Sequence, residues 1–172
     1  MKKLITLILI LFTITSYGQT KLDKEIFKVV NEYRVSNGLT EWEWNKKLFK
    51  VAEKHNYYQT QINSISHEEQ SDVKSHVEVN SLGGRAEEGD INNWRKVGEN
   101  LAVTPSENLS ISEIAEKVLI MWINSPPHHE LLLCPDYHYQ YVAVSSHITT
   151  DYVKAVNCKK WTYVTLNVLA TF

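Results

Sequence analysis

The order of its hydrophobic patterns is the sequence feature that most restricts how this chain can fold. Apolar residues recur at helical spacing in residues 22–33, 48–62 and 111–122. Two later segments, 139–148 and 161–170, are instead rich in Val, Tyr, Trp and Thr, which favour strands. Because the helices come first and the strands last, we expect an α+β fold with helices packed on an antiparallel sheet.

Capping residues mark the expected ends of these helices. Thr20 and Asp23 form a capping pair before the first helix, and Ser110 with Glu113 forms a capping box before the third. Pro126-Pro127 should end the third helix, because proline disfavours helix in the residue before it and donates no backbone hydrogen bond.

Residues 1–18 have the pattern of a secretory signal peptide. A charged start and an apolar run over residues 4–12 precede two small residues, Ser16 and Gly18, at the −3 and −1 positions of a cleavage site. The run is much shorter than the roughly 20 residues that a permanent membrane span needs. We therefore expect residues 19–172 to be exported as a single domain, to the periplasm, the cell surface or the medium.

Composition excludes several other classes of protein. The 18 basic and 20 acidic residues give a net charge of −2, and no Lys/Arg block follows the first three residues, so we expect no nucleic-acid partner. With 22% charged residues, 6 Gly and 4 Pro, the chain is neither collagen-like nor disordered. No second run of membrane length follows the signal peptide, and we expect no stable membrane anchor.

Residues 151–156 are compatible with a short strand or with a simple connection.

The chain contains two cysteines, Cys134 and Cys158, and an exported protein meets an oxidising environment. We therefore expect the two to pair in a disulfide. Closing a loop of about 25 residues would contribute roughly 3–4 kcal/mol to stability in the chain-entropy model. The alternative is a pair of buried free thiols.

Seven histidines raise the question of a metal or acid–base site. His55 lies on the apolar face of the second helix, which favours a packed core residue. His67 lacks the second histidine of the zinc-protease pattern His-Glu-x-x-His, and we interpret it as a solvated loop residue. Two stretches stand out: residues 98–102, where a carboxylate among apolar residues needs a partner, and Trp122 to His128, where a histidine follows the end of a helix. From the pattern alone, a structural role is favoured over a functional one at both.

Read in order along the chain, these stretches resemble the CAP superfamily, the cysteine-rich secretory, antigen 5 and pathogenesis-related 1 proteins that share the SCP domain. The bacterial secreted branch is the most similar. The residues that carry the resemblance are Val30-Asn31-x-x-Arg34, Leu39 to Trp44, Ser75-His76, Arg85, Gly98-Glu99-Asn100-Leu101-Ala102, Trp122 to His128, Tyr141 to Val144 and Tyr163 to Asn167. The resemblance implies a three-layer α-β-α sandwich with a central antiparallel sheet, in agreement with the hydrophobic patterns.

The resemblance also implies a cleft in which two histidines and two glutamates converge and can hold a divalent cation. The matching cleft residues of this chain are His76, Glu99, Asn100, Ser125 and His128, with Ser125 in place of the second glutamate. His67 is the runner-up for the first histidine position.

Two histidines and one carboxylate, here His76, His128 and Glu99, form a competent ligand set for Zn²⁺ with a fourth position open to water. The loss of one carboxylate lowers the affinity expected for hard ions such as Mg²⁺ or Ca²⁺. The alternative is a metal-free cluster in which Glu99 holds the two imidazoles by hydrogen bonds. Both arrangements are compatible with the sequence.

Two functions from different classes follow from the resemblance. The favoured one is a non-enzymatic extracellular binding module for a lipid, glycan, peptide or protein. The alternative is a secreted hydrolase, peptidase-like or esterase-like, in which a zinc-bound water or a histidine base attacks the substrate. A nucleophilic Ser125 has little support, because no Gly-x-Ser-x-Gly motif is present and its position beside Pro126 explains it as a helix end.

Overall fold

The computed structural model of the protein describes residues 19–69, 81–136, 139–150, 158 and 160–172. The expected signal peptide and the possible strand at 151–156 lie outside the described residues. The elements, in chain order, are α1 (Lys21–Ser36), β1 (Glu43–Trp44), α2 (Lys46–Ile62), α3 (Leu82–Glu88), β2 (Trp94–Pro105), α4 (Ile111–Ile123), α5 (Pro126–Leu132), β3 (Tyr141–Thr149) and β4 (Trp161–Thr171).

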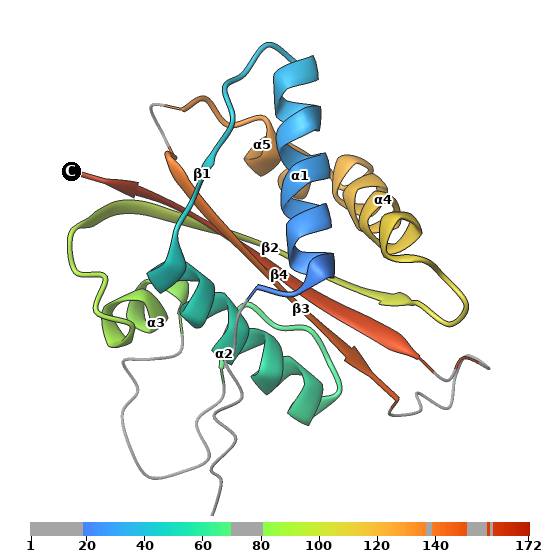
Figure 1. Ribbon diagram of the computed structural model, residues 1–172. Helices are drawn as coiled ribbons and strands as arrows, with labels where there is room; N and C mark the ends of the chain where they lie inside the picture. The colour runs from blue at the N-terminus through green and yellow to red at the C-terminus, as the bar shows by residue number, and fades with distance from the viewer. Residues whose placement is uncertain (1–18, 70–80, 137–138, 151–157, 159) are drawn as a thin grey trace, which may run out of the picture.

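The strands of the described residues form one sheet in the order β1-β3-β4-β2. The central strand β4 is antiparallel to both of its long neighbours, β2 and β3, whereas the two-residue β1 is parallel to β3. Helices α1, α4 and α5 cover one face, and α2 and α3 cover the other (Figure 1). The fold is the expected three-layer α-β-α sandwich, with a short parallel strand added at one edge.

Each face of the sheet has its own hydrophobic core, because successive residues of a strand point to opposite sides. Val164, Leu166 and Val168 of β4 pack against α1 and α4, in a cluster that includes Trp122. Leu169 faces the other side and packs with α2 and α3, in a cluster that includes Leu48. This double burial explains why β4 is buried from Trp161 to Ala170, including polar residues such as Thr165 and Asn167.

The predicted capping boxes at Thr20 with Asp23 and at Ser110 with Glu113 are both present, and they begin α1 and α4. The prolines have a second role that the sequence reasoning missed. Helix α4 ends at Ile123, before the two prolines, but Pro126 then becomes the first residue of α5. Proline suits that position because the first residue of a helix needs no N–H partner.

The predicted disulfide is wrong in this structure, because Cys134 and Cys158 are both free. Cys134 lies near Tyr139, whose hydroxyl donates to the carbonyl of Val97 near the start of β2. Cys158 packs against Trp161, which pairs with the last residue of β2. Eight residues of strand separate these two places, about 25 Å, whereas a disulfide needs Cα atoms within about 7 Å.

Within the described residues, no helix combines the length and the apolar character that crossing a membrane requires.

Candidate functional site

The candidate site lies at β2, the edge strand of the sheet, where groups from both faces can approach one another. Glu99 and Asn100 are neighbours on this strand and point to opposite faces. Asn100 pairs with Leu166, which belongs to the core beside α1 and α4, so Glu99 faces the layer that contains α2 and α3.

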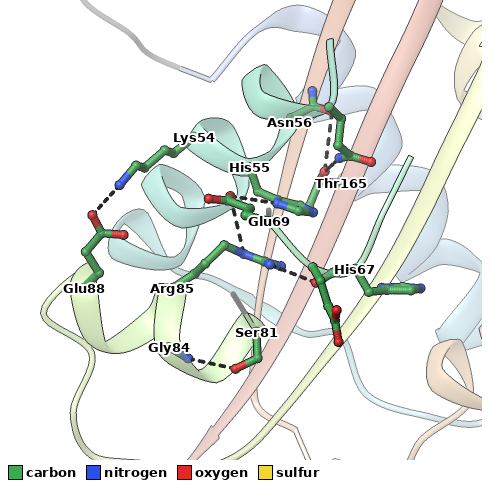
Figure 2. Close-up of polar contacts among 12 residues, drawn as sticks. Lys54, His55, Asn56, His67, Glu69, Ser81, Gly84, Arg85, Glu88 and Thr165 are labelled. Atoms are coloured by element: carbon green, nitrogen blue, oxygen red, sulfur yellow. Dashed lines mark hydrogen bonds and ion pairs between the residues drawn. The ribbon is translucent and has the colours of Figure 1, made fainter. Parts of the chain in front are cut away.

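Glu99 is a buried carboxylate, only 4% exposed, and both of its oxygens are occupied. The guanidinium of Arg85 on α3, 3% exposed, donates from Nη2 to Oε2 at 2.7 Å. The ring of His67 lies 3.0 Å from Oε1 through its Nδ1 atom. Arg85 also donates to the backbone carbonyl of His67 at 2.9 Å (Figure 2). It therefore binds both partners of the His67–Glu99 contact.

A second carboxylate, Glu69, extends this network to α2 (Figure 2). His55 is fully buried, with Nδ1 2.9 Å from Glu69 Oε1 and Nε2 2.8 Å from the carbonyl of Ser66. Its Nε2 also lies 3.8 Å from Glu99 Oε1, and Arg85 Nε lies 3.9 Å from Glu69 Oε1. These contacts attach the loop that carries His67 to α2 and α3. Charged groups can be buried away from water only when they are paired, and here they are paired with one another.

The two imidazoles nearest the edge of the sheet have opposite pKa shifts. The hydrogen bond with Glu99 raises the pKa of His67, against burial and the charge of Arg85, although 60% of its side chain is exposed. Burial, together with the nearby charge of His67, lowers the pKa of His128. The site therefore favours the protonated form of His67 more than water does, and the neutral form of His128.

His128 is positioned from the opposite face of the sheet. The side-chain amide of Asn100 donates to the carbonyl of His128 at 2.9 Å. Helix α5 can approach β2 closely at Gly98, where an added Cβ would stand 2.7 Å from the Leu131 side chain. A larger residue at position 98 would require the end of the Leu131 side chain to move.

The predicted cleft residues have different outcomes. His76 lies outside the described residues, whereas the runner-up His67 is in direct contact with Glu99. His128 lies close enough to His67 for their charges to interact, and Asn100 supports its backbone. Ser125 is the N-cap of α5, and its hydroxyl forms no hydrogen bond with the described residues.

Three members of the network were not predicted as site residues: His55, Glu69 and Arg85. The interpretation of His55 as a packed, hydrogen-bonded core residue agrees with its contacts. The sequence could have identified Arg85 as the partner of Glu99. A carboxylate within an apolar stretch needs a buried cation, and Arg85 is one of the residues that carry the family resemblance. No pattern of spacing singled out Glu69.

The described residues alone do not complete a site for a divalent cation, and His76 lies outside them. No group of three His, Cys, Asp or Glu among them is arranged to hold a metal ion. One oxygen of Glu99 is taken by the guanidinium of Arg85 at 2.7 Å, so a second cation there would face a buried positive charge. Arg85 supplies the positive charge that a metal ion would bring.

A cavity of about 450 Å³ opens beside this network. It is lined by residues from the His67 loop, the start of α3 and β2, among them His67, Ser81, Gly83, Trp94 and Glu99. Its volume lies in the range of small-ligand sites, and it combines an aromatic ring with several polar groups.

Comparisons with known proteins place this geometry in a family context. A family model described as CAP, the cysteine-rich secretory protein family, matches residues 27–167. Among curated proteins, the uncharacterized membrane protein YlbC of Bacillus subtilis (strain 168) is 29% identical over 137 residues, which are 79% of this chain and 35% of that protein. The chain thus spans about a third of the length of this curated relative.

Two solved structures have a similar fold. One is an extracellular protein containing an SCP domain from Bacillus anthracis, with a TM-score of 0.62 and 22% identity, covering 87% of this chain and 40% of that one. The other is an outer surface protein from Borrelia burgdorferi, with a TM-score of 0.67 and 19% identity, covering 90% of this chain and 96% of that one. At these identities the likeness shows the fold alone.

Proposed function

This chain belongs to the CAP family of cysteine-rich secretory proteins, and we propose that it is an exported, non-enzymatic binding module that takes a polar ligand into the cleft at Glu99 without a resident metal ion. The ligand class is a peptide or glycan segment. The observation that carries the proposal is the buried Arg85–Glu99 ion pair, which makes the cleft floor rigid and already charge-balanced.

Export is supported by two kinds of observation. Residues 1–18 have the charged start, apolar run and small-residue exit of a signal peptide. The two solved relatives are an extracellular protein and an outer surface protein, and the curated relative is a membrane protein, so all three function at or beyond a membrane. We propose the outer face of the cell or the medium as the place of action.

The character of the cleft supports a polar ligand over a lipid. Its walls include the exposed imidazole of His67, the carboxylate of Glu68 and the hydroxyl of Ser81. These groups offer both donors and acceptors, and an acyl chain laid over the Glu68 carboxylate would leave that charge without a partner. Trp94 adds a flat apolar surface of the kind that commonly orients a ligand.

Binding is tested by probing glycan and peptide arrays with the protein and measuring the strongest hits by calorimetry. We expect His67→Ala to weaken binding about tenfold, because a charge-assisted hydrogen bond contributes about 1.5–3 kcal/mol. Glu87→Gln, on the same helix as Arg85 but absent from the cleft lining, is the matched control and should leave binding unchanged. Binding that is indifferent to His67→Ala would place the ligand elsewhere and refute the proposed site.

The metal-free character is tested separately, by calorimetric titration with Zn²⁺. We propose His67 as the first histidine of the cluster, and the His67→Ala/His128→Ala variant should give the same heats as the wild type. A His76→Ala variant covers the other histidine position. A saturable zinc signal in the wild type that either variant loses would overturn the metal-free cluster.

One observation favours hydrolysis as a second candidate function. The lowered pKa of His128 keeps its imidazole neutral and able to accept a proton near neutral pH. A screen with ester, peptide and glycan substrates tests this alternative, and we expect no turnover above background. Turnover that disappears in both Glu99→Ala and His128→Ala would establish an enzyme in place of a binding module.

A further inference from the structure

A second cavity, of about 560 Å³, lies on the other side of α2 and shares no lining residue with the cleft at Glu99. It opens between α2, the beginning of α1 and the end of β3, which lie beside one another in Figure 1. The residues of its lining that matter here are Asp23, Lys50, Glu53, Tyr57 and His147. Its volume is typical of sites for small molecules.

Glu53 is the carboxylate of this cavity that is available to a ligand. It is partly buried and makes no hydrogen bond or ion pair with the described residues. Its pKa is raised by burial first and by the charge of Asp23 second, against a lowering effect of Lys50. A cation brought to Glu53 would relieve both the burial of its charge and the repulsion from Asp23.

Asp23 contributes negative potential but no free oxygen. Its side chain is 1% exposed, and Oδ1 accepts from the backbone N–H of Ser146 at 2.7 Å and from its hydroxyl at 2.5 Å. Oδ2 accepts from the backbone N–H of Thr20 at 2.6 Å. The charge of Asp23 is therefore held in place beside the cavity, and Glu53 is left to make the direct contact.

Two rings form an aromatic wall next to this carboxylate. Tyr57, one turn along α2 from Glu53, is 58% exposed, unusually open for a large side chain, and it meets the ring of His147 edge-on at 6.5 Å. The face of an aromatic ring attracts an ammonium group, by about 0.5–2 kcal/mol depending on exposure. A carboxylate and an exposed tyrosine face at one cavity are the elements of a site for an organic cation.

The lysines of the lining do not fill that role. Lys54 lines the cavity, but its ammonium group is paired with Glu88 on α3 at 2.5 Å (Figure 2). Lys50 is exposed at the rim, and it interacts with Glu53 through its charge without a hydrogen bond or ion pair. A bound cation would therefore compete with the charge of Lys50 for Glu53.

We propose that this cavity binds an organic ammonium group, a lysine side chain or a quaternary amine, with Glu53 as its counter-ion and Tyr57 and His147 as its aromatic wall. The site is independent of the cleft at Glu99 and does not rest on the function proposed for that cleft.

The test is an NMR titration of the protein with choline, following the side-chain signals of Tyr57 and His147. The matched control ligand is 3,3-dimethylbutan-1-ol, which has the shape of choline without its charge. Glu53→Gln should weaken choline binding about tenfold, the usual range for a charge-assisted contact. Lys50→Met should strengthen it several-fold, because the competing cation is gone. His67→Ala, in the other cleft, should have no effect.

Several results would overturn the proposal. One is that the neutral alcohol shifts the same signals at the same concentrations as choline, which would mean a purely apolar pocket. Another is that Lys50→Met weakens binding, which would mean an anionic or neutral polar ligand for which Lys50 is a donor. A titration with millimolar choline that leaves the Tyr57 and His147 signals unmoved also refutes it. Because Glu53 and Lys50 are not core residues, circular dichroism should show both variants folded as the wild type.

Discussion

Replacing Arg85 with methionine removes the cation from a carboxylate that is almost completely buried. Arg85 and Glu99 are 3% and 4% exposed, and their atoms meet at 2.7 Å. Removing one partner of a buried pair costs about 3–5 kcal/mol. After Arg85→Met, the largely exposed His67 is left beside the Glu99 carboxylate. At about 2–4 °C per kcal/mol for a chain of this size, Tm should fall by about 6–20 °C.

The assay is urea unfolding followed by circular dichroism, with Glu99→Gln and the Arg85→Met/Glu99→Gln variant completing a double-mutant cycle. The double variant should cost less than the sum of the single ones, with a coupling energy of about 0.5–3 kcal/mol. Lys54→Met is the matched control, since its pair with Glu88 also holds α3 but lies in solvent, with 61% of the lysine side chain exposed. Its loss should change the free energy of unfolding by at most about 1 kcal/mol.

Two outcomes would refute the reasoning. If Arg85→Met costs no more than Lys54→Met, the guanidinium does not compensate a buried charge. If the coupling energy is near zero, the two side chains act independently and the distance between them has no energetic consequence. A further consequence concerns metal ions: Arg85→Met should bind Zn²⁺ more tightly than the wild type, because Glu99 loses its competing cation.

Three other predictions concern single groups. NMR titration of His67 should give a pKa above the ordinary value for histidine, and Glu99→Gln should lower it, because the hydrogen bond to the carboxylate is the main cause of the shift. Since that pKa is raised, the stabilisation by this pair is full below the ordinary histidine pKa of about 6.5 and is lost as the pH rises through the folded-state value. Glu53→Gln should raise Tm at neutral pH and change it little in acid. The reason is that a carboxyl group with a raised pKa destabilises the fold once it ionises. Equal shifts of Tm at both pH values would contradict this. A thiol assay on denatured, unreduced protein should find both Cys134 and Cys158 free, and the absence of thiols would show that the disulfide forms after all.

Local patterns in the sequence predicted the α+β fold and several helix ends, and the family resemblance implied the three layers. The capping boxes at Thr20 and Ser110 depend on residues three positions apart, and such signals can be read directly from the chain. Helix α5 was missed because the same two prolines that stop one helix can start the next. The short strand β1 depends on pairing with β3, almost a hundred residues away, and no local signal reveals it.

The site was only partly predictable for the same reason. Glu99 and His128 were found from the pattern of the family, and the contact of Glu99 with His67 was only the second choice. The spacing of residues cannot decide between two histidines in one long loop, since only the folded path shows which one reaches β2. The prediction of a disulfide was wrong because it rested on the redox environment, which determines whether cysteines can oxidise. It does not determine how far apart they lie; here the length of β2 separates them.

The position of β4 has a consequence for how the protein is made. The middle strand of the sheet is the last to be synthesised, and β2 and β3 each pair with it and not with each other. A nascent chain that lacks residues 161–171 therefore cannot close either core: β2 has no partner strand, and β3 has only the two-residue β1. Folding therefore has to wait until residues 161–171 have been made, so the preceding segments stay open until then.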